Sequence, residues 1–170
     1  MKRTHGFTLI ELLLVLAIIG IISAIAIPAL LSQRARARDK ASQQNAVGRV
    51  GDLVGQWDKF REKGFSNATA INSMQNYLKA TAAKDKNRWN TTASPFNTTF
   101  QTPSGNATAS GFAGAITGAT GTTMGQPQFA IQVPTGSKPG FFGTAVYLNG
   151  SFKTTAGSFT HIYTKVTSLE

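Results

Sequence analysis

The residues of this 170-residue chain that could do chemistry gather at its N-terminus. Glu11 is the only acidic residue before Asp39, and it stands at the start of a long apolar run. An unpaired carboxylate in an apolar environment is costly, and such a group usually has a function. A carboxylate near a helix start is also favourable to the helix dipole and can reach the membrane interface. Glu11 is therefore predicted either to have a function or to lie at the interface.

A short basic leader precedes this carboxylate. The leader, MKRTHG, carries Lys2 and Arg3 and ends in Gly6, and Phe7 follows directly. The helix dipole and a position at the interface explain why Glu11 is tolerated at the start of a helix. They do not explain why a basic leader ends in Gly-Phe shortly before it.

Few other side chains could support catalysis or bind a metal ion. The sequence has no cysteine and two histidines, His5 and His161. The lack of cysteine excludes disulfides, cysteine-ligated zinc, iron–sulfur clusters and thiol catalysis. The C-terminal part has no cluster of acidic residues that could ligate calcium. We therefore expect no enzymatic activity, no cofactor and no metal site.

The element that positions Glu11 is the apolar run from Leu12 to Leu31, which has no charged residue. A helix of that length would be about 30 Å long, matching the hydrocarbon core of a bilayer. A buried helix of a soluble protein is one alternative. A cleaved signal peptide is another, but its apolar region would be shorter. Gly20 and Pro28 are tolerated in membrane helices, so the run is predicted to be a retained transmembrane span.

Together these residues resemble a known family. Lys2 and Arg3, followed by Gly6-Phe7-Thr8-Leu9-Ile10-Glu11-Leu12, are similar to the class III leader and N-terminal signature of type IV pilins and pseudopilins. The resemblance covers Met1 to Leu31 and includes Pro28. The rest of the chain matches that family only in general architecture.

The resemblance implies a role for each of these positions. Prepilin peptidase would cut between Gly6 and Phe7, and Phe7 would become an N-methylated N-terminus. Glu11 would pair with the N-terminal amine of a neighbouring subunit and set the axial register of the filament. The helix would be locally melted near Gly20 and Pro28 in the assembled filament. The leader would lie in the cytoplasm and the C-terminal part outside, although charge counting alone favours the opposite orientation.

The helix is predicted to continue over residues 32–64 as an amphipathic segment. Its apolar positions recur at steps of three and four and form one stripe that should pack on a sheet. The stripe consists of Ala46, Val47, Val50, Leu53, Val54, Trp57 and Phe60. Gly48, Gly51 and Gly55 either form a flat ridge for close approach or weaken the helix. Gly64 is predicted to be the C-cap.

A second, shorter helix is predicted to follow, with Asn67 as its N-cap. Its apolar side would comprise Ile71, Met74, Tyr77, Leu78 and Ala82. The stretch 89–137 then contains no charged residue and is rich in Thr, Ser, Asn, Gly and Ala. Phenylalanines anchor it, so we expect an exposed loop or insertion with short strands.

Five Asn-X-Ser/Thr sequons are candidate glycosylation sites: Asn67, Asn90, Asn97, Asn106 and Asn149. N-linked modification needs a suitable transferase. Modification through Ser or Thr is an alternative, and an unmodified polar surface is another.

The C-terminal third is predicted to form antiparallel strands. Residues 128–133 alternate between apolar and small or polar side chains, which is typical of a strand. Residues 145–153 contain Asn149-Gly150, the signal of a type I′ hairpin turn. Residues 159–166 are predicted to form a further strand. The expected fold is α+β, a long N-terminal helix on a small antiparallel sheet, as in the type IV pilin fold. Its parts are a leader (1–6), a transmembrane or filament-core helix (7–31), an amphipathic continuation (32–64) and a globular head (65–170).

The chain has a net charge of +10, which could indicate a nucleic-acid partner. The one basic run, Arg34, Arg36, Arg38 and Lys40, could contact lipid headgroups or DNA, but a solvated helix face is the simpler interpretation. DNA is therefore not indicated as a partner.

The expected function is that of a structural subunit, a major pilin of a type IV pilus. The partners would be further copies of the chain, prepilin peptidase, and an inner-membrane platform with its ATPase. The precursor would lie in the inner membrane and the filament outside the cell, serving adhesion, motility or DNA uptake. A pseudopilin of a type II secretion system and a minor or competence pilin are the alternatives.

Overall fold

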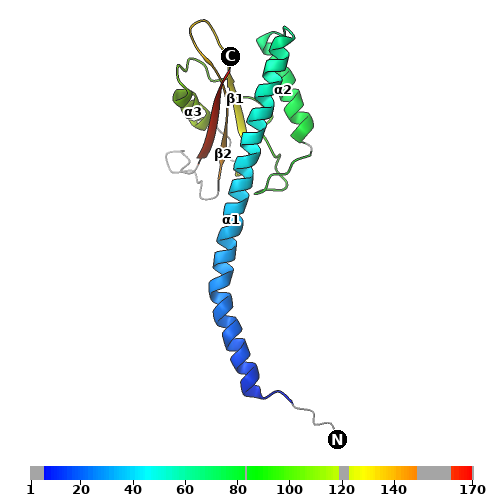
Figure 1. Cartoon of the computed structure of the whole chain (residues 1–170), viewed down its shortest axis with the longest axis vertical. Coiled ribbons are helices and arrows are strands. Elements are labelled where there is room, and N and C mark those ends of the chain that lie inside the picture. Colours follow the sequence, from blue (N-terminus) through cyan, green and yellow to red (C-terminus); the bar gives the residue numbers. More distant parts are fainter. Residues whose placement is uncertain (1–5, 83, 119–122, 149–161, 170) are drawn as a thin grey trace. The chain divides into compact units, whose positions relative to one another are not determined.

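The structure is a computed structural model, and it describes residues 6–82, 84–118, 123–148 and 162–169. Its elements follow the order α1 (Leu9–Glu62), α2 (Asn67–Ala82), α3 (Ala109–Gly118), β1 (Gln128–Gln132), β2 (Gly140–Tyr147) and β3 (Ile162–Leu169) (Figure 1). The chain divides into an N-terminal unit, Met1–Ala37, and a C-terminal unit, Arg38–Glu170. The α+β class predicted from the sequence is confirmed.

The second half of α1 belongs to the C-terminal unit and buries one stripe. Its buried residues recur at steps of three and four: Ser42, Ala46, Val50, Leu53 and Trp57. The predicted stripe is confirmed at four positions, whereas Val47 is 36% exposed. Gly48, Gly51 and Gly55 have no atom of another element within 4 Å of the position a Cβ would take. No described part of the chain therefore uses them for close approach.

The end of α1 is a Schellman motif built around Gly64, as predicted. Gly64 has a φ of 74° and its N–H donates to the carbonyl of Arg61, while the N–H of Phe65 donates to the carbonyl of Phe60. The rings of Phe60 and Phe65 stack with centroids 5.6 Å apart, which supplies the hydrophobic contact of this motif.

The N-cap of α2 is Ser66, so the prediction of Asn67 was wrong. The Ser66 carbonyl accepts from the N–H of Ala70, and its hydroxyl accepts from the N–H of Thr69. Asn67 instead accepts a hydrogen bond from Arg61 through its side-chain oxygen. Both residues are good caps, and the Schellman turn decides between them by placing Ser66 at the half-helical position.

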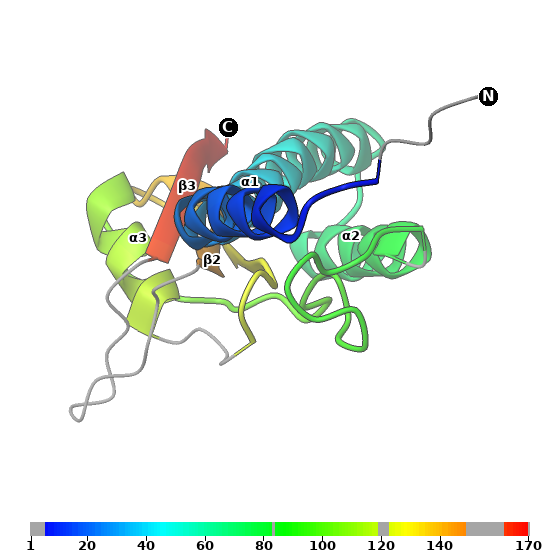
Figure 2. The same ribbon diagram turned by 90° about the horizontal axis from the view of Figure 1, so that it is seen from below.

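The sheet has the order β1-β2-β3, and both of its ladders are antiparallel. One face packs against α1 and α2 through a core that includes Leu53, Met74 and Phe142. The other face packs against α3 through Phe112 and Ile116. Figure 2 shows α2 and α3 on opposite sides of the strands. The C-terminal unit therefore has three layers, and every residue of β1 and β2 is buried.

The neutral stretch 89–137 contains a helix, α3, that was not predicted from its Gly- and Ala-rich sequence. Gly143 lets this helix approach the sheet. A Cβ at this position would lie 3.0 Å from Ile116 and 2.8 Å from the backbone oxygen of Lys165. The predicted hairpin at Asn149-Gly150, its strand to Lys153 and the first residues of the strand from 159 lie outside the described residues.

Candidate functional site

The first turn of α1 is a capping box formed by Thr8 and Glu11. The backbone N–H and the hydroxyl of Thr8 each donate to Glu11 Oε2 at 2.8 Å, and the N–H of Glu11 donates to Thr8 Oγ1 at 3.3 Å. The carboxylate is thus held at the helix N-terminus, where the helix dipole favours a negative charge. Among the described residues, the Glu11 carboxylate is held by the backbone N–H and the hydroxyl of Thr8.

Thr8 is the functional residue that sequence reasoning missed. The signal was present as Thr8-Leu9-Ile10-Glu11, the T-x-x-E pattern of a capping box before an apolar run. The charge and depth of Glu11 beside the apolar run do not reveal this partner; its spacing of three residues from Thr8 does.

Gly6 and Phe7 lie directly before this turn in a non-helical segment. Both are exposed, Phe7 to 89%. The peptide bond between them is therefore outside the helical hydrogen-bond ladder and open to an approaching enzyme. The rest of the leader, residues 1–5, lies outside the described residues.

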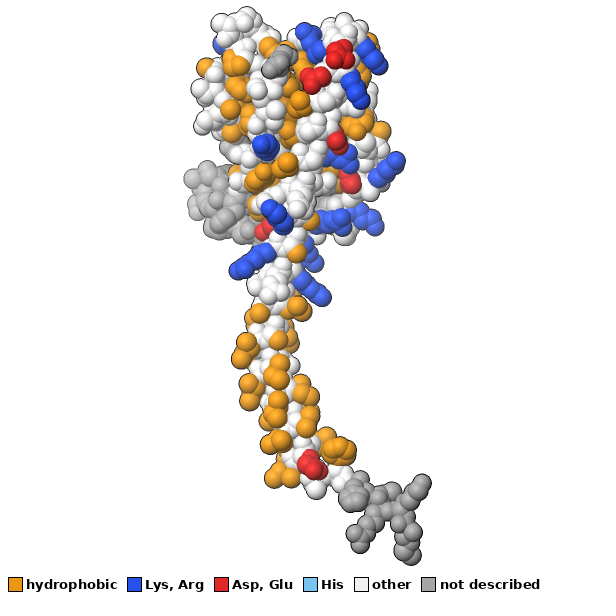
Figure 3. All heavy atoms as spheres, viewed as in Figure 1, with side chains coloured by type: hydrophobic (Ala, Val, Ile, Leu, Met, Phe, Trp, Pro, Cys, Tyr) orange, Lys and Arg blue, Asp and Glu red, His pale blue; other side chains and the backbone are white. Residues whose placement is uncertain are grey.

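The apolar run forms one helical surface without an intramolecular partner among the described residues. Its large side chains, from Leu9 to Leu31, are between 47% and 77% exposed. Figure 3 shows hydrophobic side chains covering the first part of α1. This part of the helix is long and apolar enough to cross a membrane. Apolar surface left in water is unfavourable in proportion to its area.

Gly20 and Pro28 both lie within this continuous helix. Pro28 has no N–H to donate, so one hydrogen bond of the ladder is missing there. Gly20 has no other atom within 4 Å of its Cβ position. Both positions weaken the helix, and local melting in a filament remains a prediction.

The candidate glycosylation sites differ in how their side chains are used. Asn97 Nδ2 donates to Gln128 Oε1, and Asn106 Nδ2 donates to Gln132 Oε1 at 3.0 Å. Both glutamines are buried in β1, and these bonds help to satisfy their side-chain oxygens; Gln132 Oε1 also accepts from the backbone N–H of Asn106. Asn90 is exposed and its side-chain oxygen accepts from the hydroxyl of Thr92 at 2.7 Å. Asn149 lies outside the described residues.

Metal ligands are not gathered in the described ranges. Within them, no group of three or more histidine, aspartate or glutamate residues is placed to hold an ion. His5 and His161 both fall outside those ranges.

Comparison with known proteins supports the N-terminal assignment. The family model described as the prokaryotic N-terminal methylation motif matches residues 1–27. The type IV wide pilus major component PilA4 of Thermus thermophilus is 59% identical over 39 residues, which cover 23% of this chain and 30% of that protein. The type IV major pilin protein PilA of Myxococcus xanthus is 51% identical over 43 residues, which cover 25% of this chain and 20% of that protein.

A third relative extends the similarity beyond the first helix turns. The type II secretion system core protein G of Klebsiella pneumoniae is 27% identical over 84 residues, which cover 49% of this chain and 57% of that protein. The matches thus span less than two thirds of the length of each of these relatives. No solved structure matches this chain at a significant level. Residues 1–27 carry the prokaryotic N-terminal methylation motif, and the resemblance to type IV pilins and pseudopilins indicated by the sequence is confirmed.

Proposed function

We propose that this protein is the major structural subunit of a type IV pilus and polymerises through its N-terminal helix. The observation that carries the proposal is the joining of a methylation motif to a helix whose apolar side chains are exposed from Leu9 to Leu31. N-terminal processing exposes a new terminus directly before the apolar helix. That helix can then insert into a membrane and later pack against copies of the same helix in a filament.

The proposed division of the chain follows its chemistry. Residues 1–6 are the leader, removed by prepilin peptidase at the exposed Gly6–Phe7 bond, and Phe7 is then N-methylated. Residues 7–31 anchor the precursor in the inner membrane and form the core of the filament. Residues 32–64 join this core to the globular head, 65–170, which forms the outer surface. An inner-membrane platform and an ATPase drive assembly, and the protein itself is not an enzyme.

Glu11 sets the register in this proposal, and its capping box refines how. A carboxylate already bonded to Thr8 enters the membrane with its charge satisfied, so the free subunit does not carry a bare anion. The amine of a neighbouring Phe7 would then add to an acceptor that is held in place. A subunit in the wrong register would leave both charges unpaired in an apolar environment.

A pseudopilin is the second candidate, because the similarity to core protein G of the type II secretion system covers 49% of the chain. The neutral, Thr- and Gly-rich region from Trp89 to Ser137 suits an exposed filament better than a short periplasmic structure. Adhesion, twitching motility and DNA uptake are uses of the filament surface. Asn90, whose side chain is exposed, is the candidate site best placed to carry a glycan on that surface.

Filaments shed from the native cells test the proposal directly. Electron microscopy should show filaments, and mass spectrometry of their subunit should give a mass lacking Met1–Gly6 and increased by one methyl group. A Gly6→Val variant, with a bulky side chain beside the scissile bond, should keep its leader and form no filaments. A subunit that is processed but found only in the cell envelope would contradict the pilus and favour the pseudopilin.

A further inference from the structure

The C-terminal unit contains a polar cleft between the second half of α1 and the segment that follows α2. Its volume is about 320 Å³, and it is lined by Ala41, Gln44, Asn45, Asp85, Lys86 and Arg88. All six residues belong to the unit Arg38–Glu170. Ala41 is the one apolar residue of this lining, so the cleft offers no apolar floor to a lipid chain or an aromatic ring. A volume of this size is at the lower end of the range for small-molecule sites.

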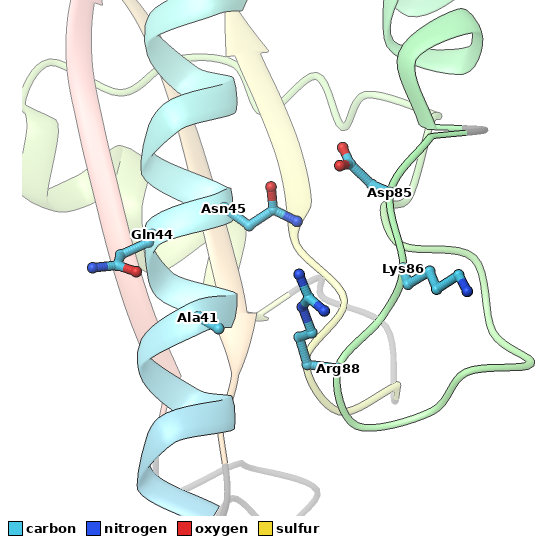
Figure 4. Close-up of a pocket in the computed structure, with 6 residues that line it drawn as sticks. All are labelled: Ala41, Gln44, Asn45, Asp85, Lys86 and Arg88. Carbon is cyan, nitrogen blue, oxygen red and sulfur yellow. The ribbon is translucent and has the colours of Figure 1, made fainter.

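Three polar side chains of the lining converge on the cleft, and we call them the polar triad. Figure 4 shows Asn45 and Arg88 pointing toward each other across the space between α1 and the 84–88 segment, with the Asp85 carboxylate directed from that segment toward α1. Gln44 and Lys86 point away from this space. The triad therefore consists of an amide, a guanidinium and a carboxylate.

The charges of the triad cancel. Asp85 is negative and Arg88 is positive, and Lys86, the remaining charged residue of the lining, points away. Behind the triad, Asp85 is paired with Arg49, and Arg49 is also paired with Asp52. These two arginines and two aspartates together have a net charge of zero. A small anion would therefore meet as much repulsion as attraction here.

The triad presents hydrogen-bond donors and acceptors side by side. Among the described residues, the side chains of Asn45 and Arg88 have no hydrogen-bond partner, so the amide can donate and accept and the guanidinium can donate. Asp85 uses Oδ2 to bind Arg49, which leaves Oδ1 as an acceptor. A hydroxyl group both donates and accepts. A ligand with several neighbouring hydroxyl groups can therefore satisfy all three side chains at once.

The segment that carries two members of the triad is held by bonds within the C-terminal unit. Asn87 is buried, its amide nitrogen donates to the carbonyl of Met124, and its side-chain oxygen accepts from the N–H of Trp89. The ion pair between Arg49 and Asp85 ties the same segment to α1. A frame that is formed beforehand reduces the entropy lost when a ligand binds.

We propose that the cleft between Asn45 and Arg88 binds one unit of a neutral saccharide through its hydroxyl groups. Asp85 accepts from a hydroxyl, Arg88 donates to a hydroxyl oxygen, and the Asn45 amide does both. Binding by the single chain does not depend on the proposed function, but its use does. A filament with one such cleft in every subunit would hold a glycan-covered surface through many weak contacts at once.

Saturation-transfer NMR on the full chain tests the proposal. The chain is kept in micelles of lauryldimethylamine oxide, because that detergent has neither a sugar nor a phosphate in its headgroup. The probes are the methyl glycosides of glucose, galactose, mannose and N-acetylglucosamine. At least one of them should receive saturation from the protein, and its dissociation constant should be equal in about 50 mM and about 500 mM salt, because the ligand is uncharged. Transfer to none of the probes overturns the proposal.

Two matched pairs of variants locate the binding site. Asn45→Ala should raise the dissociation constant about tenfold, because it removes a group that donates and accepts. Gln44→Ala removes the same kind of amide from a side chain that points away, and it should leave the constant unchanged. Arg88→Gln should raise the constant about fivefold, whereas Lys86→Gln removes the same charge and should have no effect. Urea unfolding checks that all four variants fold.

Equal effects within each pair would overturn the proposal, because the saccharide would then bind elsewhere. If Asn45→Ala does not fold, the comparison of Arg88→Gln with Lys86→Gln decides. Displacement of the glycoside by millimolar inorganic phosphate, or binding that disappears at high salt, would assign the cleft to an anion and also overturn the proposal. A chain that binds the glycoside but never appears in shed filaments contradicts the proposed function and supports the saccharide site.

Discussion

Both ends of α1 carry apolar side chains, but only one end buries them within the chain. Between Leu9 and Leu31 the large side chains surround the helix, and each is at least 47% exposed. Between Ser42 and Trp57 the apolar residues are confined to a stripe, and Leu53 in that stripe has no exposed surface. Hydrophobic surface left in water is unfavourable in proportion to its area. The second stretch is therefore covered by its own chain, whereas no described residue covers the first.

The largest effect is expected from a change in the first stretch that leaves the second untouched. Glu11→Ala should permit leader cleavage but reduce filament yield more than about 100-fold. Removing one partner of a buried ion pair leaves the other charge unpaired and costs about 3–5 kcal/mol. The measurement is the ratio of shed filaments to mature subunit in the membrane. Glu62→Ala, at the exposed end of α1, is the matched control and should assemble normally; normal yields for Glu11→Ala would refute the register argument.

The stripe is tested by its own large-to-small pair. Leu53→Ala should lower the free energy of unfolding of the C-terminal unit by about 2–5 kcal/mol, because it opens a cavity in a closed core. Leu16→Ala removes the same atoms from a side chain that is 57% exposed, so it should leave that free energy unchanged. Urea unfolding of the full chain in detergent measures both. Equal effects would show that the two stretches are not distinct.

The packing of α3 on the opposite face of the sheet can be tested by a substitution with a smaller expected effect. Gly143→Ala should destabilise the C-terminal unit by about 1–3 kcal/mol, because the new methyl group meets Ile116 and a backbone oxygen. Gly51→Ala adds the same group where no other element lies within 4 Å, and it should stabilise α1 by up to about 1 kcal/mol. Thermal unfolding compares the two. A stable Gly143→Ala variant would mean that α3 does not pack as closely as described.

The smallest effect is confined to alkaline solution. Burial raises the pKa of Tyr147 to about 12, against about 10 in an unfolded chain. Below pH 10 both states hold the proton and this group does not change stability. Between pH 10 and 12 the unfolded state loses its proton first, so the free energy of unfolding should fall as pH rises. Urea midpoints at pH 9, 10 and 11 should fall less in Tyr147→Phe; parallel curves would contradict the shift.

Local signals in the sequence predicted the N-terminal half of the molecule well. Three local signals were sufficient: a charge-free run, a stripe at helical spacing and a glycine after the last helical residue. The structure confirms the helix, its buried stripe and the place where it ends. The choice of cap failed at Asn67 because Ser66 is equally suited by type. Only the turn at Gly64 decides which of the two residues lies at the start of α2.

Long-range contacts explain what the sequence could not show. Gln128 and Gln132 are polar residues of the strand predicted over 128–133, yet both are buried and bonded to Asn97 and Asn106. Their hydrogen-bond partners lie far away in the sequence, so these hydrogen bonds could not be predicted from it. The same holds for α3, whose small residues have little helical signal of their own and which is completed by packing on the sheet.

The fastening of residues 97–106 to β1 has a further consequence. The side chains of Asn97 and Asn106 bond to β1, and the backbone of Gln101 exchanges hydrogen bonds with Phe129 and Ile131. None of these links is covalent, and the sequence contains no cysteine. Refolding therefore requires no oxidant and no isomerase that shuffles thiols. The closure of the C-terminal unit therefore does not depend on whether the surrounding compartment is oxidising or reducing.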